Sequence, residues 1–356
     1  GSALHPERRF GCRCPPVDPD AEKLGENGVM SDGRIVLDIQ DLKTCFHTEK
    51  GDVRAVDGVS LGIPEGTTLG VVGESGCGKT VLALSVMRLI PIPPGEIVSG
   101  EIFLDGVDLL MLNREEMRKV RGKRISMIFQ EPMTSLNPVV TVGAQIAEIV
   151  RLHEGKNGKE ALEYAVEMLD MVGIDHPEKR ARDYPHQMSG GMRQRIMIAM
   201  ALACKPRLMI ADEPTTALDV TVQAQILELM EDLKKRINTS ILFITHDLGV
   251  IAHFAQNVAI MYAGKVVEQA PVGSFFNSPL HPYSLGLIEA VPVITKEWDR
   301  KKRLRMIPGM VPDMTASIEG CAFQDRCGYV MPVCREREPE LIEKRAGHHV
   351  RCWKWA

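Results

Sequence analysis

One glycine-rich segment, residues 73–80, has the pattern G-x-x-x-x-G-K-T and constrains this chain more than any other feature. The run Thr68–Val72 before it is apolar and strand-like, and Thr80–Leu89 after it reads as a helix. Glycines let backbone N–H groups turn inward around phosphates, and the positive end of the following helix dipole points at them. The segment consists of Gly73, Glu74, Ser75, Gly76, Cys77, Gly78, Lys79 and Thr80.

Two side chains at the end of this segment predict what it binds. We expect Lys79 to neutralise β- and γ-phosphate oxygens and the Thr80 hydroxyl to ligate Mg²⁺. A chance glycine-rich turn would match the pattern, but it would need neither the strand before it nor the helix after it. The segment and its setting therefore predict a P-loop NTPase. Cys77 is interpreted as a passive occupant of a tolerant loop position, although its neighbours could lower a thiol pKa.

A pair of adjacent carboxylates follows a second apolar run. Leu208–Ala211 reads as a buried strand, and Asp212 and Glu213 come directly after it. Ligands of open α/β sheets bind at the carboxyl ends of the strands. We expect Asp212 to hold Mg²⁺ through water and Glu213 to polarise the water that attacks the γ-phosphate. Alone, such a pair is often only a solvated strand end, and it is the phosphate loop that favours the catalytic interpretation.

Strand-like and helix-like segments alternate from Ile35 to about Ala270, which predicts an α/β fold with a mainly parallel sheet. Prolines interrupt the chain after that point. We expect a disordered, tag-like extension, a nucleotide-binding domain that contains a helical subdomain, and a small irregular domain that contains cysteines. The expected ranges are 1–33 for the extension, 34–270 for the nucleotide-binding domain, about 139–187 for its helical subdomain, and 271–356 for the last domain.

Bulk composition excludes some partners without identifying one. The 356 residues carry a net charge of −4, which gives no support to nucleic-acid binding. No apolar run approaches the roughly 20 residues that a membrane-spanning helix needs, so other chains would have to cross a membrane if this one works there. Nine cysteines, an odd number, without an export signal predict a reducing compartment and no disulfide framework.

A third segment distinguishes the chain from other P-loop proteins. Ser189, Gly190 and Gly191 precede a helix-like stretch that runs through Cys204, so their N–H groups can form a second anion site. The segment from Gln187 to Arg195 resembles the signature of ABC ATPases, with methionines where that family usually has leucine and glutamine. The resemblance implies that this site faces the γ-phosphate held by another subunit, so that two chains close head-to-tail over two ATP molecules. A helix cap without a ligand is the alternative.

The resemblance assigns four more positions, which follow in the order of the family. Gln130 resembles the glutamine that senses Mg²⁺ and touches the membrane subunits. Asp219 matches the aspartate at the dimer interface, and His246 matches the switch histidine that contacts the γ-phosphate. Phe46 stands at the place of the aromatic residue that stacks on adenine, where an ordinary apolar residue is the alternative.

Four cysteines lie near the end of the chain among glycines, prolines and charged residues. A region with so little core needs a staple, and four thiolates can hold zinc or an iron–sulfur cluster. The close cysteine pairs of most zinc sites are absent. His348 and His349 lie near the last cysteine and are expected at the surface. The four cysteines are Cys321, Cys327, Cys334 and Cys352.

This part of the chain resembles the carboxyl-terminal region of oligopeptide and dipeptide transporter ATPases. The resemblance is carried by His281–Tyr283, by Ile307–Gly309 and by the Cys-x-Phe-x-x-Arg-Cys pattern of Cys321–Cys327. It implies that the four cysteines hold a four-iron, four-sulfur (4Fe-4S) cluster with a structural role. Zinc and unligated cysteines stay open as alternatives.

The combined resemblance implies an ATP-hydrolysing subunit that powers import of di- or oligopeptides from the cytoplasmic face of the inner membrane. ATP and Mg²⁺ are the expected cofactors. The expected partners are a second, paralogous ATPase subunit, two transmembrane permease subunits and an external substrate-binding protein. The same machine with another cargo, such as nickel, a sugar or an antimicrobial peptide, is one alternative. A soluble ABC ATPase of DNA repair or of ribosomes is another, and the acidic net charge argues against it.

Overall fold

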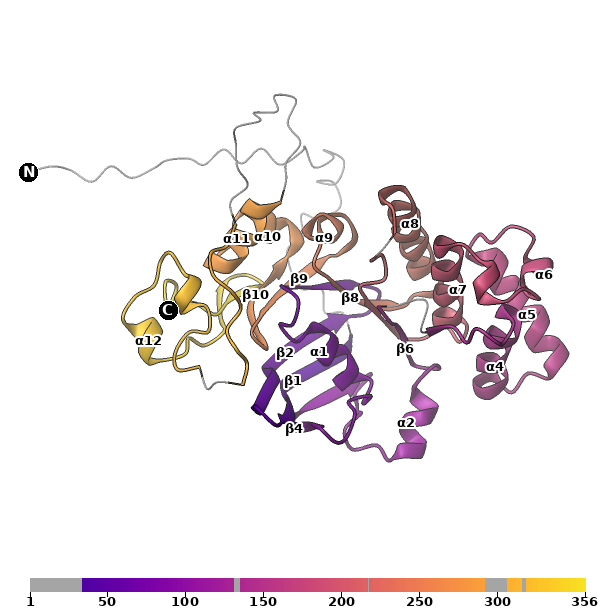
Figure 1. Cartoon of the computed structure of the whole chain (residues 1–356), viewed down its shortest axis with the longest axis horizontal. Coiled ribbons are helices and arrows are strands. Elements are labelled where there is room, and N and C mark those ends of the chain that lie inside the picture. Colours follow the sequence, from indigo (N-terminus) through magenta and orange to yellow (C-terminus); the bar gives the residue numbers. More distant parts are fainter. Residues whose placement is uncertain (1–33, 131–134, 217, 292–305, 316–317) are drawn as a thin grey trace, which may run out of the picture.

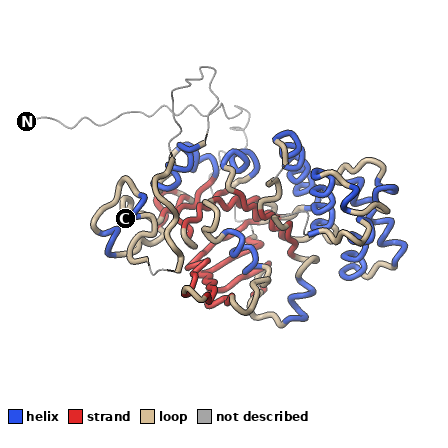
Figure 2. The backbone as a smooth tube through the Cα atoms, viewed as in Figure 1, coloured by secondary structure: helices blue, strands red, loops and turns tan. Residues whose placement is uncertain are grey.

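The computed structural model describes residues 34–130, 135–216, 218–291, 306–315 and 318–356. The extension expected over 1–33 lies wholly outside the described residues. Two sheets organise the rest, and Figure 2 shows their strands in the middle of the molecule, with a group of helices at one end. One sheet has four strands in the order β2-β1-β4-β5, and the other has eight in the order β11-β12-β10-β9-β3-β8-β7-β6.

The smaller sheet is antiparallel and was not anticipated by the prediction of a mainly parallel sheet. Its two long strands are joined at a turn after Thr48, and both pair along most of their length despite several bulges. Together with α1, this smaller sheet packs against the eight-stranded sheet (Figure 1). Its strands are β1 (Ile35–Thr48), β2 (Gly51–Pro64), β4 (Gly95–Leu104) and β5 (Val107–Asp108).

The larger sheet has a parallel centre, in which β6, β7, β8, β3 and β9 run in the same direction. The segments that follow β3, β7, β8 and β6 therefore leave the sheet at one edge. The strands are β3 (Thr68–Val72), β6 (Ile125–Ile128), β7 (Leu208–Asp212), β8 (Ser240–Thr245), β9 (Asn257–Tyr262), β10 (Lys265–Pro271), β11 (Ile342–Arg345) and β12 (His348–Val350).

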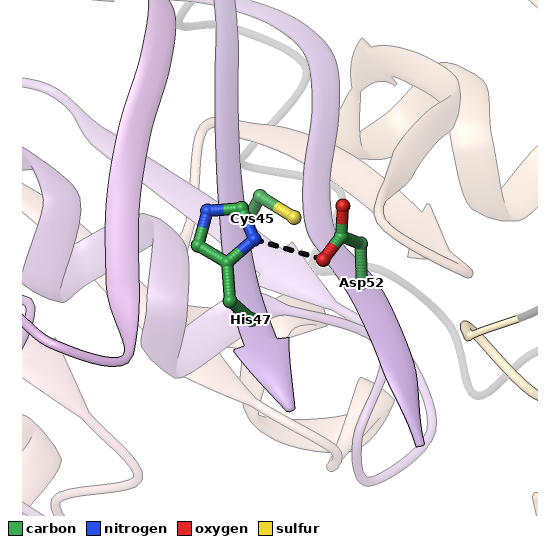
Figure 3. A group of neighbouring side chains, drawn as sticks. All are labelled: Cys45, His47 and Asp52. Atoms are coloured by element: carbon green, nitrogen blue, oxygen red, sulfur yellow. Dashed lines mark hydrogen bonds and ion pairs between the residues drawn. The ribbon is translucent and has the colours of Figure 1, made fainter. Parts of the chain in front are cut away.

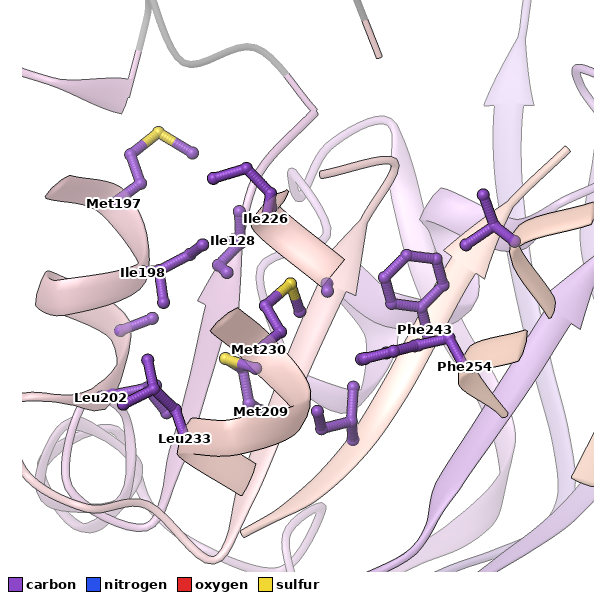
Figure 4. Close-up of a cluster of buried hydrophobic side chains, with 14 of the residues drawn as sticks. Ile128, Met197, Ile198, Leu202, Met209, Ile226, Met230, Leu233, Phe243 and Phe254 are labelled. Atoms are coloured by element: carbon purple, nitrogen blue, oxygen red, sulfur yellow. The ribbon is translucent and has the colours of Figure 1, made fainter. Parts of the chain in front are cut away.

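Side-chain alternation places this sheet between two hydrophobic cores. Neighbours in a strand point to opposite faces. Leu242 and Ile244 accordingly face the core that is shared with the antiparallel sheet, whereas Ile241 and Phe243 face the helices. Figure 4 shows this second core, where α7, α8 and α9 cover the sheet and the ring centroids of Phe243 and Phe254 lie 4.8 Å apart. Both faces are buried, which explains why these strands are continuous apolar runs.

The helices begin at recognisable signals. Asn113 and Asn157 each form a capping box with a glutamate three residues later, which satisfies free backbone N–H groups at the starts of α2 and α5. Helices α4 to α7 gather at one end of the molecule (Figure 1). The helices are α1 (Lys79–Val86), α2 (Arg114–Val120), α4 (Val142–Glu154), α5 (Gly158–Met171), α6 (Pro177–Arg180), α7 (Gly190–Leu202), α8 (Val220–Ile237), α9 (Leu248–Phe254), α10 (Val272–Asn277), α11 (Pro282–Ala290) and α12 (Val333–Glu336), with short 3₁₀ turns η2 (Pro185–Gln187) and η3 (Gln324–Arg326).

None of the helices in the described ranges combines the length and the apolarity that crossing a bilayer requires.

The chain after Pro271 continues the larger sheet. Strand β12 pairs with β10, and Phe275, Tyr283 and Phe323 belong to the same core as the central strands. The expected boundary near residue 271 therefore does not separate two hydrophobic cores. The prediction that His348 lies at the surface is wrong, because it is 1% exposed.

Candidate functional site

The glycine-rich loop lies between β3 and α1, as the sequence predicts, and close backbone packing explains its glycines. A Cβ atom at Gly73 would collide with the carbonyl oxygen of Met261, and one at Gly78 would collide with that of Ala55. Gly78 also has φ 104°, a conformation that other residues rarely adopt. The shape of the loop therefore depends on glycine at both positions.

The ammonium group of Lys79 is folded into this loop. Its Nζ donates to the carbonyl oxygens of Gly73 at 2.8 Å and Glu74 at 3.1 Å, and the residue is 5% exposed. A positive charge is thus held inside the turn where phosphate oxygens are expected. Cys77 is fully buried, and burial raises the pKa of its thiol, so the loop does not activate it.

Asp212 ends β7 and is 1% exposed. Burial raises its pKa, and a hydrogen bond with Thr80 opposes that effect. The Oδ1 atom has no hydrogen-bond partner in the described part of the chain. A buried carboxylate oxygen without a partner is costly unless something binds it. Asp212 and Thr80 together therefore offer an oxygen pair of the kind that Mg²⁺ accepts.

Glu213 is the centre of a hydrogen-bonded group that joins three strand ends. Gln130, which follows β6, donates from Nε2 to Glu213 Oε2 at 3.2 Å. His246, which follows β8, places Nδ1 3.2 Å from Glu213 Oε1. Thr216 donates from Oγ1 to Oε2 at 3.0 Å. The structure thus brings together three residues singled out in the sequence and adds Thr216, whose position three residues after Glu213 was the available signal.

The environment of Glu213 keeps its carboxylate ionised. Burial opposes ionisation, but the hydrogen bonds from His246 and Thr216 outweigh it and lower the pKa of Glu213. The residue also has φ 48°, a left-handed conformation that is uncommon outside glycine. Such strain occurs often at functional sites, where the surrounding structure holds it.

Ser189 and Asp219 begin helices and lie apart from the Lys79 loop. The Ser189 Oγ accepts from the Met192 N–H at 3.3 Å at the start of α7, and Asp219 Oδ1 accepts from the Val222 N–H at 2.9 Å at the start of α8. Gly190 and Gly191 form the first turn of α7. Figure 1 shows α7 beside α4–α6, away from α1. A single chain does not join these residues to its own phosphate loop.

Phe46 lies in β1 beside Gly95 of β4, and the side chains flanking it form a polar group. His47 Nδ1 is 2.8 Å from Asp52 Oδ1, and the ligand atoms of Cys45, His47 and Asp52 lie within 4.8 Å of one another (Figure 3). These three could approach a metal ion. However, the imidazole is already paired with Asp52, and the hydrogen bond that it donates to this carboxylate raises the pKa of His47.

The four carboxyl-terminal cysteines are free thiols that the fold gathers into one region. The Cys321 N–H donates to the Cys334 carbonyl oxygen at 2.7 Å. Burial, followed by the nearby cysteines, raises the pKa of Cys321 to about 11, and burial likewise raises the pKa of Cys327 and Cys352. Burial therefore favours the protonated form of these three thiols unless a metal binds them. Four thiols are donors of the kind that zinc or an iron–sulfur cluster takes, but no three of these sulfur atoms lie within 4.8 Å of one another.

Comparison with known proteins first defines the general class to which this chain belongs. The family model described as ABC transporter matches residues 56–216. The chain also resembles a solved post-hydrolysis dimer of the ATP-binding cassette MJ0796 bound to ADP and phosphate, with a TM-score of 0.60, 26% identity, and coverage of 66% of this chain and 98% of that one. The fold is that of a P-loop ATPase of the ABC class.

The relatives narrow this class. A second model, for the carboxyl-terminal region of oligopeptide/dipeptide transporters, matches residues 267–334. A probable peptide ABC transporter ATP-binding protein of Sinorhizobium fredii is 54% identical over 90% of this chain and 95% of its own length. The oligopeptide transport protein OppD of Bacillus subtilis is 52% identical over 89% of this chain and 88% of its own length. The chain belongs to the family of peptide ABC transporter ATP-binding proteins, and it is an ATPase.

Proposed function

We propose that this chain energises an importer of di- and oligopeptides by hydrolysing ATP at the cytoplasmic face of a membrane. The main support is the convergence of four strand ends, which place Lys79, Asp212 and the Glu213 group at one edge of the sheet. The relatives' names supply the transported class. Another relative, the dipeptide transport ATP-binding protein DppD of Lactococcus lactis, is 47% identical to this chain over 89% of this chain's length.

The residues of the phosphate loop and of the strand ends have different roles in ATP hydrolysis. Lys79 and the loop N–H groups bind the phosphates of ATP. Thr80 and Asp212 would hold Mg²⁺, with Gln130 near it, and the ion supplies charge neutralisation at the phosphates. Glu213, held ionised by its neighbours, orients the attacking water and draws a proton from it. His246 positions Glu213 and reaches toward the γ-phosphate, and Phe46 stacks on the adenine.

The other half of each ATP site comes from a second ATPase subunit. Ser189, Gly190 and Gly191 present helix N-terminal N–H groups that their own chain does not bring to its phosphate loop. An anion is stabilised at such a position. Asp219 lies at the same interface. The partner chain is a paralogue, two permease subunits contact the region of Gln130, and an external binding protein delivers the peptide.

The four cysteines hold a 4Fe-4S cluster that fixes the carboxyl-terminal region. Their free thiols and shared location support a four-thiolate site, and their spacing lacks the close pairs of most zinc sites. Protein isolated without oxygen should show broad visible absorption with iron and sulfide in a ratio of about one to one. Stoichiometric zinc without iron would contradict the cluster and show that the four cysteines hold zinc instead.

Reconstitution tests the transport function. The chain is combined in liposomes with its paralogous ATPase partner, the two permeases and the binding protein. Uptake of a labelled dipeptide or oligopeptide is then followed with ATP supplied on the side of the membrane where the ATPase subunits lie. Peptide uptake that requires hydrolysable ATP is expected. ATP-driven uptake of nickel or a sugar, with none of peptide, would contradict the proposed cargo.

A further inference from the structure

The phosphate loop is tied to the carboxyl-terminal region through one residue, Glu74. Arg326 donates to both carboxylate oxygens of Glu74, from Nη1 to Oε2 at 2.8 Å and from Nη2 to Oε1 at 2.9 Å. The side chain of Arg326 is 6% exposed and that of Glu74 is 30% exposed. A paired, two-pronged contact of this kind fixes orientation as well as charge. It joins residues 252 positions apart in the sequence.

The backbone of Glu74 is held as firmly as its side chain. Its N–H donates to the hydroxyl oxygen of Tyr283 at 3.0 Å, and its carbonyl oxygen accepts from Lys79 at 3.1 Å. Tyr283 is fully buried, with its ring centroid 4.7 Å from that of Tyr262 and 5.4 Å from that of Phe323. Every polar group of Glu74 therefore has a partner, and two of these partners belong to the carboxyl-terminal region.

Arg326 is itself held from several sides. Its Nε donates to the carbonyl oxygen of Pro308 at 2.9 Å, and its guanidinium carbon lies 5.6 Å from the ring centre of Tyr262 and 5.9 Å from that of Phe323. The side chain is thus fixed before any nucleotide binds. The His-Pro-Tyr, Ile-Pro-Gly and cysteine segments all meet at this contact.

We propose that Arg326 is a positioning residue for ATP binding, through which the carboxyl-terminal region sets the affinity of the phosphate loop. Glu74 places a carboxylate within a loop that binds phosphates, and like charges repel. Arg326 neutralises that carboxylate and fixes its orientation. Without Arg326, Glu74 keeps its charge and loses its anchor. The inference rests on the proposed binding of ATP phosphates by residues 73–80.

The test measures MgATP affinity of the full chain by titration calorimetry. Arg326→Gln should weaken MgATP binding at least 10-fold. The double variant Glu74→Gln/Arg326→Gln should recover to within about 3-fold of Glu74→Gln alone, because the unpaired charge is gone. Recovery by removing the opposite charge separates this role from general support of the fold. The matched control is Arg335→Gln, whose side chain is 62% exposed and lies 4.0 Å from Asp325; its affinity should equal that of the wild type.

Three outcomes would overturn the proposal: wild-type affinity in Arg326→Gln, equally weak binding in the single and double variants, or equal weakening in the Arg335 control. If Arg326→Gln does not fold, Arg326→Lys provides the same test. It keeps the charge and loses the two-pronged contact, so affinity should fall about 3-fold or more; no fall overturns the proposal. Lys79→Ala distinguishes a failure of the proposed function from a failure of the role of Arg326. If Lys79→Ala binds MgATP normally, the assignment of the phosphate loop fails. If Lys79→Ala loses binding and the Arg326 variants do not, only the role of Arg326 fails.

Discussion

At the scale of single residues, Glu213 has the least ordinary environment in the site. It combines a left-handed φ of 48° with hydrogen bonds to groups from three strand ends. The lowered pKa means that its carboxylate is already ionised at neutral pH and is available as a base. Because His246 and Gln130 fix the same carboxylate, the three residues act as a unit, and the effects of their substitutions should not add.

Thr216 gives a prediction that the motifs alone do not. Thr216→Val keeps the shape of the side chain and removes the hydroxyl that donates to Glu213 at 3.0 Å. One orienting hydrogen bond is lost while His246 and Gln130 stay. The turnover number should therefore fall by roughly 5- to 30-fold, a loss of about 1–2 kcal/mol, with MgATP affinity unchanged. Steady-state ATPase assays with parallel binding titrations measure both, and an unchanged turnover number would show that Thr216 does not orient the base.

At the scale of elements, the buried carboxylate of Glu268 ties the last strands to the loop before α11. Its Oε1 lies 2.7 Å from His348 Nε2 and accepts from the Leu280 N–H at 2.8 Å, and its Oε2 accepts from the His281 N–H at 2.7 Å. The His281 Nδ1 in turn accepts the Tyr283 N–H at 3.1 Å. The loop that carries Tyr283 to the phosphate site is thus fixed by a polar network inside the shared core.

This network makes stability depend on pH. Burial lowers the pKa of His281 to about 4, although the charge of Glu268 acts in the other direction. The unfolded chain takes up this proton near pH 6.5, whereas the folded chain does not until about pH 4. The free energy of unfolding should therefore fall as pH drops through that window, by at most about 1.4 kcal/mol per pH unit from this group.

Urea unfolding at pH 7, 6 and 5 compares the wild type with His281→Asn. The asparagine oxygen can still accept the Tyr283 N–H, but it does not titrate, so the loss of stability toward pH 5 should be smaller in the variant. The same slope in both proteins would assign the pH dependence to other groups.

The elements also show what the sequence could and could not predict. Strands β3 and β7 were predictable because both of their faces are buried and their sequences are continuous apolar runs. The antiparallel pair β1 and β2 was not, because register shifts such as that between Ile39 and Leu42 break the alternation that marks a strand. Among the site residues, Lys79, Asp212 and Glu213 were predictable because each lies in a motif of neighbouring residues. Arg326 pairs with Glu74 across most of the chain, and nothing near either residue indicates the other.

At the scale of the whole molecule, the carboxyl-terminal region is part of the ATPase and does not form a separate core. It extends the sheet through β12, contributes Tyr283 and Phe323 to the core, and reaches the phosphate loop through Arg326. What holds this region together therefore bears on the stability of the whole chain. The four cysteines are the candidate staple.

Loss of one cysteine ligand should lower the melting temperature. Cys334→Ser removes a buried thiol of the proposed cluster, so iron content and thermal stability should fall together. Cys204→Ser is the matched control, because Cys204 lies outside the group and should leave the iron content unchanged. Differential scanning calorimetry and iron analysis measure the two quantities. Full iron content in Cys334→Ser would exclude this residue as a ligand.

The most direct test of the account is the behaviour of Glu213→Gln beside Glu228→Gln, which changes an exposed glutamate of α8. ATP turnover and MgATP affinity are measured for both variants of the full chain with its partner subunits. Glu213→Gln should lower turnover by roughly 100- to 10,000-fold and keep MgATP affinity, whereas Glu228→Gln should match the wild type. Wild-type turnover in Glu213→Gln would contradict it.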